Sequence, residues 1–242
     1  MTGFRFIIVL LFSLPALAWG DTTFQEQSGR LQAINAYLLD FRPAGAPTKP
    51  DKRALELVLD LYPQPSIDTR VGRKDEPIDP PNLVPKFRGR YLLASGLHLG
   101  AAYAPGIEFQ DYEAEFISLE LGYRFTLAKT HFALRASYSD GDVEGPVTEP
   151  DVTDLFDFQN QGVDLSVGRI WKDFEYYGFL GVNDIETRLD VEVDGAILRH
   201  EEDTYYGGLG VTWRRGALFV NLEQNATDDF LRNLVLSVGY RF

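Results

Sequence analysis

The chain has 242 residues, of which 45% are hydrophobic and 24% are charged, and its formal net charge is −13. An acidic chain without clustered Lys and Arg cannot displace counterions from a phosphate backbone, which excludes nucleic acid as a partner. The absence of Cys excludes disulfides and thiolate metal sites, and it fits a chain that crosses an oxidising compartment.

The first residues have the pattern of a secretory signal. Arg5 precedes an apolar run from Phe6 to Leu14, and the small-residue pattern Ala16-Leu17-Ala18 follows it. The run is too short to span a bilayer, so we predict a cleaved signal peptide over residues 1–18, with 1–20 as the alternative. No other segment has the length of apolar sequence that a membrane helix needs, so a membrane form of this chain must be a closed barrel.

Residues 19–88 are predicted to form an N-terminal periplasmic segment, with a plug inside the lumen or additional strands as the alternatives. A short helix is expected at its start, because Leu31, Ile34, Leu38 and Phe41 fall at roughly helical spacing. A stretch rich in proline precedes the next apolar segment and ends the helix.

One part of this segment alternates like a strand. Residues 55–61 place Leu at every second position, and the charged, proline-rich residues 62–85 that follow are typical of a linker. If 55–61 pairs with a second short strand near residues 67–71, the barrel has ten strands, because an odd total would leave the chain ends on opposite sides of the membrane.

Residues 89–242 are predicted to form an all-β domain. The last strand alternates large apolar residues with small or charged ones, as a strand does when it faces lipid on one side and a narrow lumen on the other. Its apolar face consists of Leu234, Leu236, Val238, Tyr240 and Phe242.

An internal repeat sets the predicted number of strands. Four segments end alike, with a glycine or small residue followed by aromatic residues, as strands do where they reach a membrane interface. The turns at one end are short, and most connections at the other end are longer and acidic. Four strands running in one direction predict an antiparallel up-and-down barrel of eight strands. The repeats are residues 119–125, 165–171, 209–214 and 236–242, and the longer connections are 104–113, 140–157 and 184–203.

The barrel resembles the small outer-membrane barrels of the outer-membrane protein A, outer-membrane protein X and opacity-protein type. Its ending, Tyr240-Arg241-Phe242, is similar to the terminal signal that the barrel-assembly machinery recognises in that class. The resemblance implies the outer membrane of a Gram-negative bacterium, contact with its lipid and lipopolysaccharide, and an assembly signal at Tyr240 and Phe242.

Charged residues are expected on the lumen face of the strands. Opposite charges inside a narrow barrel should pair, because an unpaired ion taken from water costs several kcal/mol. A polar network that fills the lumen is favoured over a pore or a buried active site. The predicted network is Glu120, Arg124, Arg135, Asp164, Glu223 and Arg241, with His98 beside it.

No catalytic residue or resident cofactor is predicted. The three histidines, His98, His131 and His200, have no neighbours at catalytic spacing. The acidic external connections could hold a divalent cation, since calcium and magnesium prefer oxygen ligands, although the order of an EF-hand is absent and a solvated acidic surface is favoured. The candidate cation ligands are Asp190, Glu192, Asp194, Glu201, Glu202 and Asp203.

Residues 184–203 are predicted to project beyond the membrane as a hairpin. Asp194-Gly195 is a strong hairpin turn signal, and the flanking segments exceed the roughly 10 residues that a strand needs to cross. The hairpin could bind a protein partner by strand addition. The predicted function is a non-enzymatic outer-membrane barrel that serves envelope integrity or surface interaction through acidic external loops. The alternatives are a small channel or transporter, and a lipid- or peptide-modifying enzyme.

Overall fold

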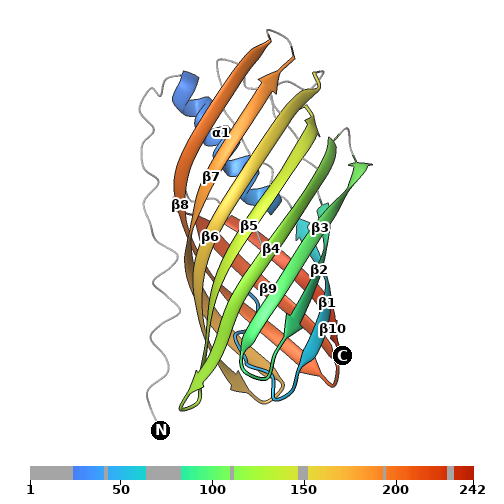
Figure 1. Ribbon diagram of the computed structural model, residues 1–242, viewed down its shortest axis with the longest axis vertical. Helices are drawn as coiled ribbons and strands as arrows, with labels where there is room; N and C mark the ends of the chain where they lie inside the picture. The colour runs from blue at the N-terminus through green and yellow to red at the C-terminus, as the bar shows by residue number, and fades with distance from the viewer. Residues whose placement is uncertain are drawn as a thin grey trace.

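In a computed structural model, the described residues form a closed antiparallel barrel of ten strands with one helix (Figure 1). It describes residues 24–40, 43–63, 83–109, 112–146, 152–192, 195–227 and 232–242. The predicted signal peptide lies outside these residues. The elements are α1 (Phe24–Asp40), β1 (Ala54–Pro63), β2 (Leu83–Leu92), β3 (Leu97–Phe109), β4 (Tyr112–Leu127), β5 (Thr130–Gly145), β6 (Asp154–Trp171), β7 (Phe174–Val191), β8 (Ala196–Arg215), β9 (Leu218–Thr227) and β10 (Arg232–Arg241).

The closed barrel is confirmed, but the prediction of eight strands is wrong. Strand β1 pairs on one side with β2 and on the other with β10, so that Leu57 lies opposite both Gly89 and Tyr240 and the ring closes there. The barrel thus begins at Ala54 and not at Gly89. The alternative of ten strands has the right number of strands. It made residues 67–71 the partner of β1, but these residues lie outside the described part of the chain, and the partner in the structure is β2.

Strand β2 looked like the end of a linker because its charges point into the barrel. Lys86, Arg88 and Arg90 are buried on the lumen face. The residues between them, which include Phe87 and Gly89, face outward. A lumen face made of three cations does not show the apolar periodicity by which a strand is usually recognised.

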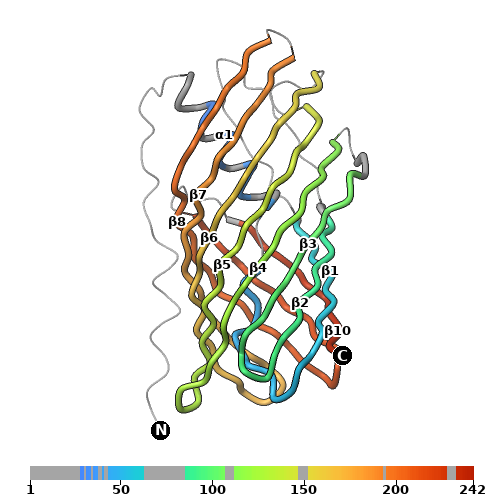
Figure 2. The backbone as a smooth tube through the Cα atoms, viewed as in Figure 1, coloured from blue at the N-terminus to red at the C-terminus, as the bar shows by residue number. Residues whose placement is uncertain are grey.

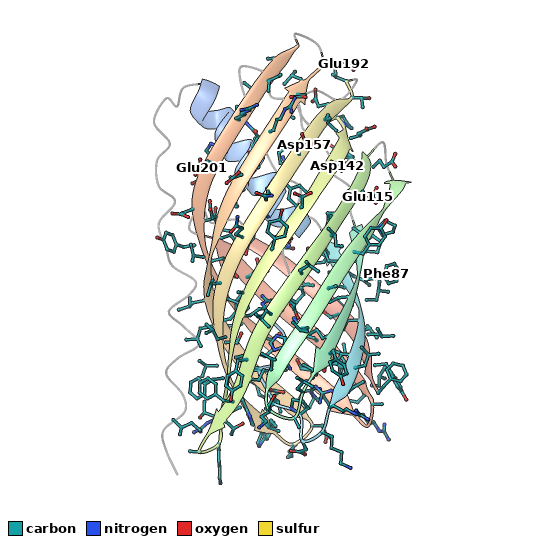
Figure 3. All side chains as sticks on the ribbon, in the orientation of Figure 1. Phe87, Glu115, Asp142, Asp157, Glu192 and Glu201 are labelled. Carbon is teal, nitrogen blue, oxygen red and sulfur yellow. The ribbon has the colours of Figure 1, made fainter. Side chains whose placement is uncertain are left out.

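The outer surface carries a broad apolar band (Figure 3). In β4, for example, Ile117, Leu119 and Leu121 are each about half exposed, while the residues between them are buried inside. Such an exterior on a ring without free sheet edges is suited to hydrocarbon. No helix within the described ranges is long and apolar enough to cross a membrane.

Strand lengths make one side of the barrel taller than the other (Figure 1). Strands β4 to β8 have 16 to 20 residues, whereas β1, β2, β9 and β10 have 10 each. Because about 10 residues cross a bilayer, the long strands continue beyond it. Parts of 104–113 and 140–157, which the sequence suggested to be external loops, are therefore strand, and strands β7 and β8 run through residues 184–203, where a hairpin was predicted.

Helix α1 lies inside the upper barrel, against β6, β7 and β8 (Figure 2). From its end, residues 43–50, here called the strap, run through the lower lumen to the start of β1. The strap has no secondary structure, and most of its residues are buried. Residues 24–40 and 43–50 therefore fill the barrel from inside, which is the plug that the sequence left as an alternative to a periplasmic segment. A ten-stranded ring needs such filling, since eight strands already enclose all that side chains alone can occupy.

The glycines of the sequence repeats lie on the lumen face beneath large side chains. A Cβ atom built at Gly210 would lie 2.2 Å from Cζ of Tyr177, which is closer than real Cβ contacts. A Cβ atom at Gly239 would meet Cζ of Phe219 at the same distance. These positions let bulky neighbours lie flat against the inner wall. The four glycines are Gly122, Gly168, Gly210 and Gly239.

Candidate functional site: a plugged lumen and an acidic outer wall

Three of the predicted lumen charges form one buried cluster. Arg135 lies between Glu120 and Asp164, with N to O distances of 3.2 Å and 2.7 Å. Arg90 of β2 also binds Glu120, its Nη2 donating to Oε2 at 3.1 Å. All four side chains are nearly inaccessible to solvent. The cluster joins β2, β4, β5 and β6 across the middle of the barrel.

The charged cluster holds the strap by its backbone. The carbonyl oxygen of Pro43 accepts hydrogen bonds from Arg88, Arg90 and Arg135 at 3.2, 3.1 and 2.9 Å. A buried segment without secondary structure must find such partners for its main-chain groups. Arg135 therefore serves both the wall of the barrel and the plug.

Glu223 holds the next residues of the strap. Its two carboxylate oxygens accept the N–H groups of Ala44 and Gly45, both at 3.1 Å. The hydroxyl of Tyr177 donates to the same carboxylate at 2.6 Å. Glu223 is thus on the lumen side, as the alternation suggested, but its partners are neutral groups and not the predicted cations.

Arg124 and Arg241 lie apart from the central cluster, nearer the end of the barrel with short turns. Arg241 donates from Nε to Oε1 of Glu56 at 2.9 Å, and Arg124 donates from Nη1 to the carbonyl oxygen of Thr48 at 3.3 Å. Thr48 also donates its N–H to Glu175 at 2.9 Å. Sequence reasoning missed Glu56 and Glu175 because β1 was not placed in the barrel and the inward face of β7 was unassigned.

The upper lumen is apolar, unlike the polar interior that we expected. Ala36 and Tyr37 of α1 pack into a core made of inward-facing aromatic and aliphatic residues of the long strands. The ring centroids of Tyr37 and Tyr206 lie 5.8 Å apart. The largest barrel residues in this core are Phe116, Phe156, Phe158, Tyr177, Phe179, Ile185, Leu189 and Tyr206.

Polar contacts fix the ends of α1. At its C-terminal end, Nδ2 of Asn160 donates to the Ala36 carbonyl at 3.2 Å and to Asp40 at 3.0 Å. Nearer its start, a Cβ atom at Gly29 would lie 2.5 Å from Nδ1 of His200, so the helix backbone lies directly against β8 there. The lumen is thus filled by the helix above and by the strap and its arginines below.

The outer surface changes character where the strands leave the apolar band. Tyr103 donates to Glu115 at 3.0 Å and Tyr138 to Asp140 at 3.3 Å, as tyrosines do at a membrane interface with one end apolar and the other hydrated. Above this level the outward residues are mainly charged; we call this region the outer wall (Figure 3). It comprises residues 112–116, 139–145, 154–160, 184–191 and 196–204.

Three carboxylates are register neighbours on the outer wall. Asp142 lies opposite both Glu115 and Asp157. Partial burial raises the pKa of Asp142 above its ordinary value, and repulsion from Asp157 and Glu115 adds to this. The outer wall thus concentrates negative charge that cations or cationic groups would relieve.

We expect Asp142→Asn to stabilise the protein slightly at neutral pH. The native pKa of Asp142 is raised, so stability falls as pH rises from the ordinary pKa of an aspartate through the raised value. The asparagine removes this loss, by about 0.5 kcal/mol or less because the site is largely hydrated. Urea unfolding in detergent at neutral and acid pH would measure it. An equal gain at both pH values would contradict the electrostatic explanation.

The candidate cation ligands do not converge on one site. Asp190 is paired with Arg188 at 2.8 Å, and Glu192 lies in the turn after β7. Alternation along β8 places Glu202 toward the lumen and its two acidic neighbours, Glu201 and Asp203, on the outside. Asp194 lies outside the described residues. Among the residues that the structure describes, no group of three potential ligands could hold a metal ion.

The three histidines lie far apart in the register. Those at the two ends of the barrel bind near neighbours: His131 contacts Thr126 at 3.0 Å by the short turn after β4, and His200 contacts Glu202 at 2.9 Å beside α1. His98 is buried in the lower lumen, 3.9 Å from Glu120.

The whole chain was also compared with known proteins. No family model matches it, and no curated protein does. Among solved structures it is similar to the attachment invasion locus protein Ail of Yersinia pestis, with 14% identity over 80% of this chain and 100% of that one and a TM-score of 0.38. It is also similar to the outer membrane protease OmpT of Escherichia coli, with 10% identity over 84% of this chain and 99% of that one and a TM-score of 0.46. A third similar structure is the toluene transporter TodX of Pseudomonas putida, with 11% identity over 85% of this chain and 72% of that one and a TM-score of 0.38. All three neighbours are outer-membrane β-barrels.

Proposed function

We propose that the protein is a non-enzymatic outer-membrane barrel whose closed body anchors the outer wall at the cell surface. The apolar band, together with a ring that satisfies its own backbone, supports placement in a membrane. The filled lumen is the observation that supports the anchoring role. It favours an anchor over a channel, because α1 occupies the upper half and the strap occupies the lower half.

The outer wall is the proposed interacting surface. Its carboxylates would bind lipopolysaccharide through divalent cations, which bridge carboxylates and phosphates. This role combines envelope integrity with surface interaction.

The hairpin of β7 and β8 offers a second mode of interaction. Strand β9 pairs with β8 only from Tyr206 to Arg215, so residues 197–205 of β8 pair with β7 alone among the described strands. An extended segment of a partner protein could add to that edge.

We expect neutralisation of the outer wall to weaken binding to lipopolysaccharide several-fold. The variant carries Glu115→Gln, Asp142→Asn and Asp157→Asn together, and binding of the full chain to lipopolysaccharide vesicles is measured with and without magnesium. Wild-type binding should depend on magnesium, and the variant should lose that dependence.

Asp173→Asn is the matched control, since Asp173 is an exposed carboxylate in a turn at the opposite end of the barrel. It should bind as the wild type does. If the triple variant binds vesicles as tightly as the wild type in magnesium, the outer wall is not the binding surface.

A further inference from the structure

A small, partly open cavity lies between the strap and the wall of the lower lumen. Gly45 and Ala46 of the strap form one side of it. Four arginines, Arg88, Arg90, Arg124 and Arg214, contribute to its lining, together with a single carboxylate, Glu56. A cavity with this lining is strongly electropositive.

Two of the four arginines have full counterions and two do not. Arg88 makes a two-pronged ion pair with Asp60, with both distances 2.9 Å, and Arg90 is paired with Glu120. By contrast, Arg124 has no carboxylate within 4.0 Å among the described residues, although its side chain is buried. A buried guanidinium without a counterion is costly, because desolvation is not offset by pairing.

Arg214 is only loosely paired. Its closest carboxylate contacts are 3.7 Å to Glu56 and 3.9 Å to Glu175. Glu56 is already engaged by Arg241, whose Nε lies 2.9 Å from Oε1. The carboxylates near the cavity therefore do not neutralise both Arg124 and Arg214.

The cavity lining also contains hydrogen-bond donors that lack an acceptor. Within the described part of the chain, Nε of Arg124 and Nε of Arg214 are buried without a partner. The amide of Asn221, which also lines the cavity, contacts the hydroxyl of Tyr177 at 2.8 Å and the hydroxyl of Thr212 at 2.7 Å. Buried donors are nearly always satisfied in folded proteins, by ordered water or an ion if not by protein atoms.

We propose that this cavity binds a halide ion between Arg124 and Arg214. Two unpartnered donors on guanidiniums without full counterions suit an occupant that accepts hydrogen bonds and carries negative charge. The cavity has room for an occupant about the size of one water molecule, which suits chloride or bromide and not phosphate. The ion would lie between barrel and plug, since Arg124 also binds the Thr48 carbonyl of the strap.

The experiment compares thermal unfolding of the full chain in detergent at one ionic strength, in sodium bromide and in sodium gluconate, whose anion is too large for the cavity. Wild-type protein should melt about 2–4 °C higher in bromide, as expected for an ion that binds only the folded state. Arg124→Gln should remove this difference. Arg188→Gln, on the outer wall, should keep it and so controls for general salt effects.

A crystal of the wild type grown in bromide provides a second measurement that needs no variant. An anomalous peak between Arg124 and Arg214 is expected. If the peak is absent and the two salts give the same melting temperature, the cavity holds water only and the proposal is overturned. A bromide effect that persists in Arg124→Gln would also overturn it.

Discussion

An Arg135→Ala variant should lose about 3–5 kcal/mol of unfolding free energy, the usual cost of removing one partner from a buried ion pair. The substitution leaves Glu120 and Asp164 without their shared cation and removes the shortest of the three hydrogen bonds to the Pro43 carbonyl. Urea unfolding in detergent micelles, followed by tryptophan fluorescence, would measure it.

The matched control is Arg188→Ala. Arg188 also binds a carboxylate, Asp190, at 2.8 Å, but its side chain is 43% exposed. Its loss should cost about 0–1 kcal/mol, as for surface ion pairs. Equal losses in the two variants would mean that Arg135 does not hold the plug and wall together as described.

Deletion of residues 24–50 should convert a barrel that does not conduct into one with measurable conductance in planar bilayers. The deletion removes α1 from the apolar upper lumen and the strap from the arginines below. Unboiled gels should still show heat-modifiable migration, which reports that the ring has formed.

A shorter deletion, of residues 24–40, separates the two parts of the plug. It should conduct less than the full deletion, because the strap still crosses the charged lower lumen, where Glu223 and Glu175 hold it. If the full-length chain already conducts as well as either variant, the lumen is not closed and the proposed function as an anchor fails.

The sequence was informative wherever lipid imposes a simple alternation. Outward Leu119 and Leu121 and inward Glu120 and Arg124 follow from that rule, as does the burial of Glu223. The rule failed for β2, where inward cations replace small polar residues and Pro85 and Gly89 face outward. It could not reveal the helix inside the barrel, because the spacing of apolar residues shows that a helix has a packing face but not what covers it.

Apart from the hairpin at residues 184–203, the outer wall was misread as loops for a different reason. Below the tyrosines a strand is apolar outside and polar inside, but above them water replaces lipid outside and α1 packs inside. The pattern therefore inverts within single strands: Phe116 of β4 is buried and Glu115 is exposed, whereas Glu120 is buried and Leu121 is exposed. A search for one continuous alternation ends at that inversion.

The position of α1 and the strap has a consequence for how the molecule must assemble. The strap lies between strands that are synthesised much later, since Ala44 and its partner Glu223 are 179 positions apart. Contacts so distant in sequence form slowly. The ring closes where β1, its first strand, pairs with β10, its last strand. The helix and the strap must therefore be inside the sheet before these two strands pair.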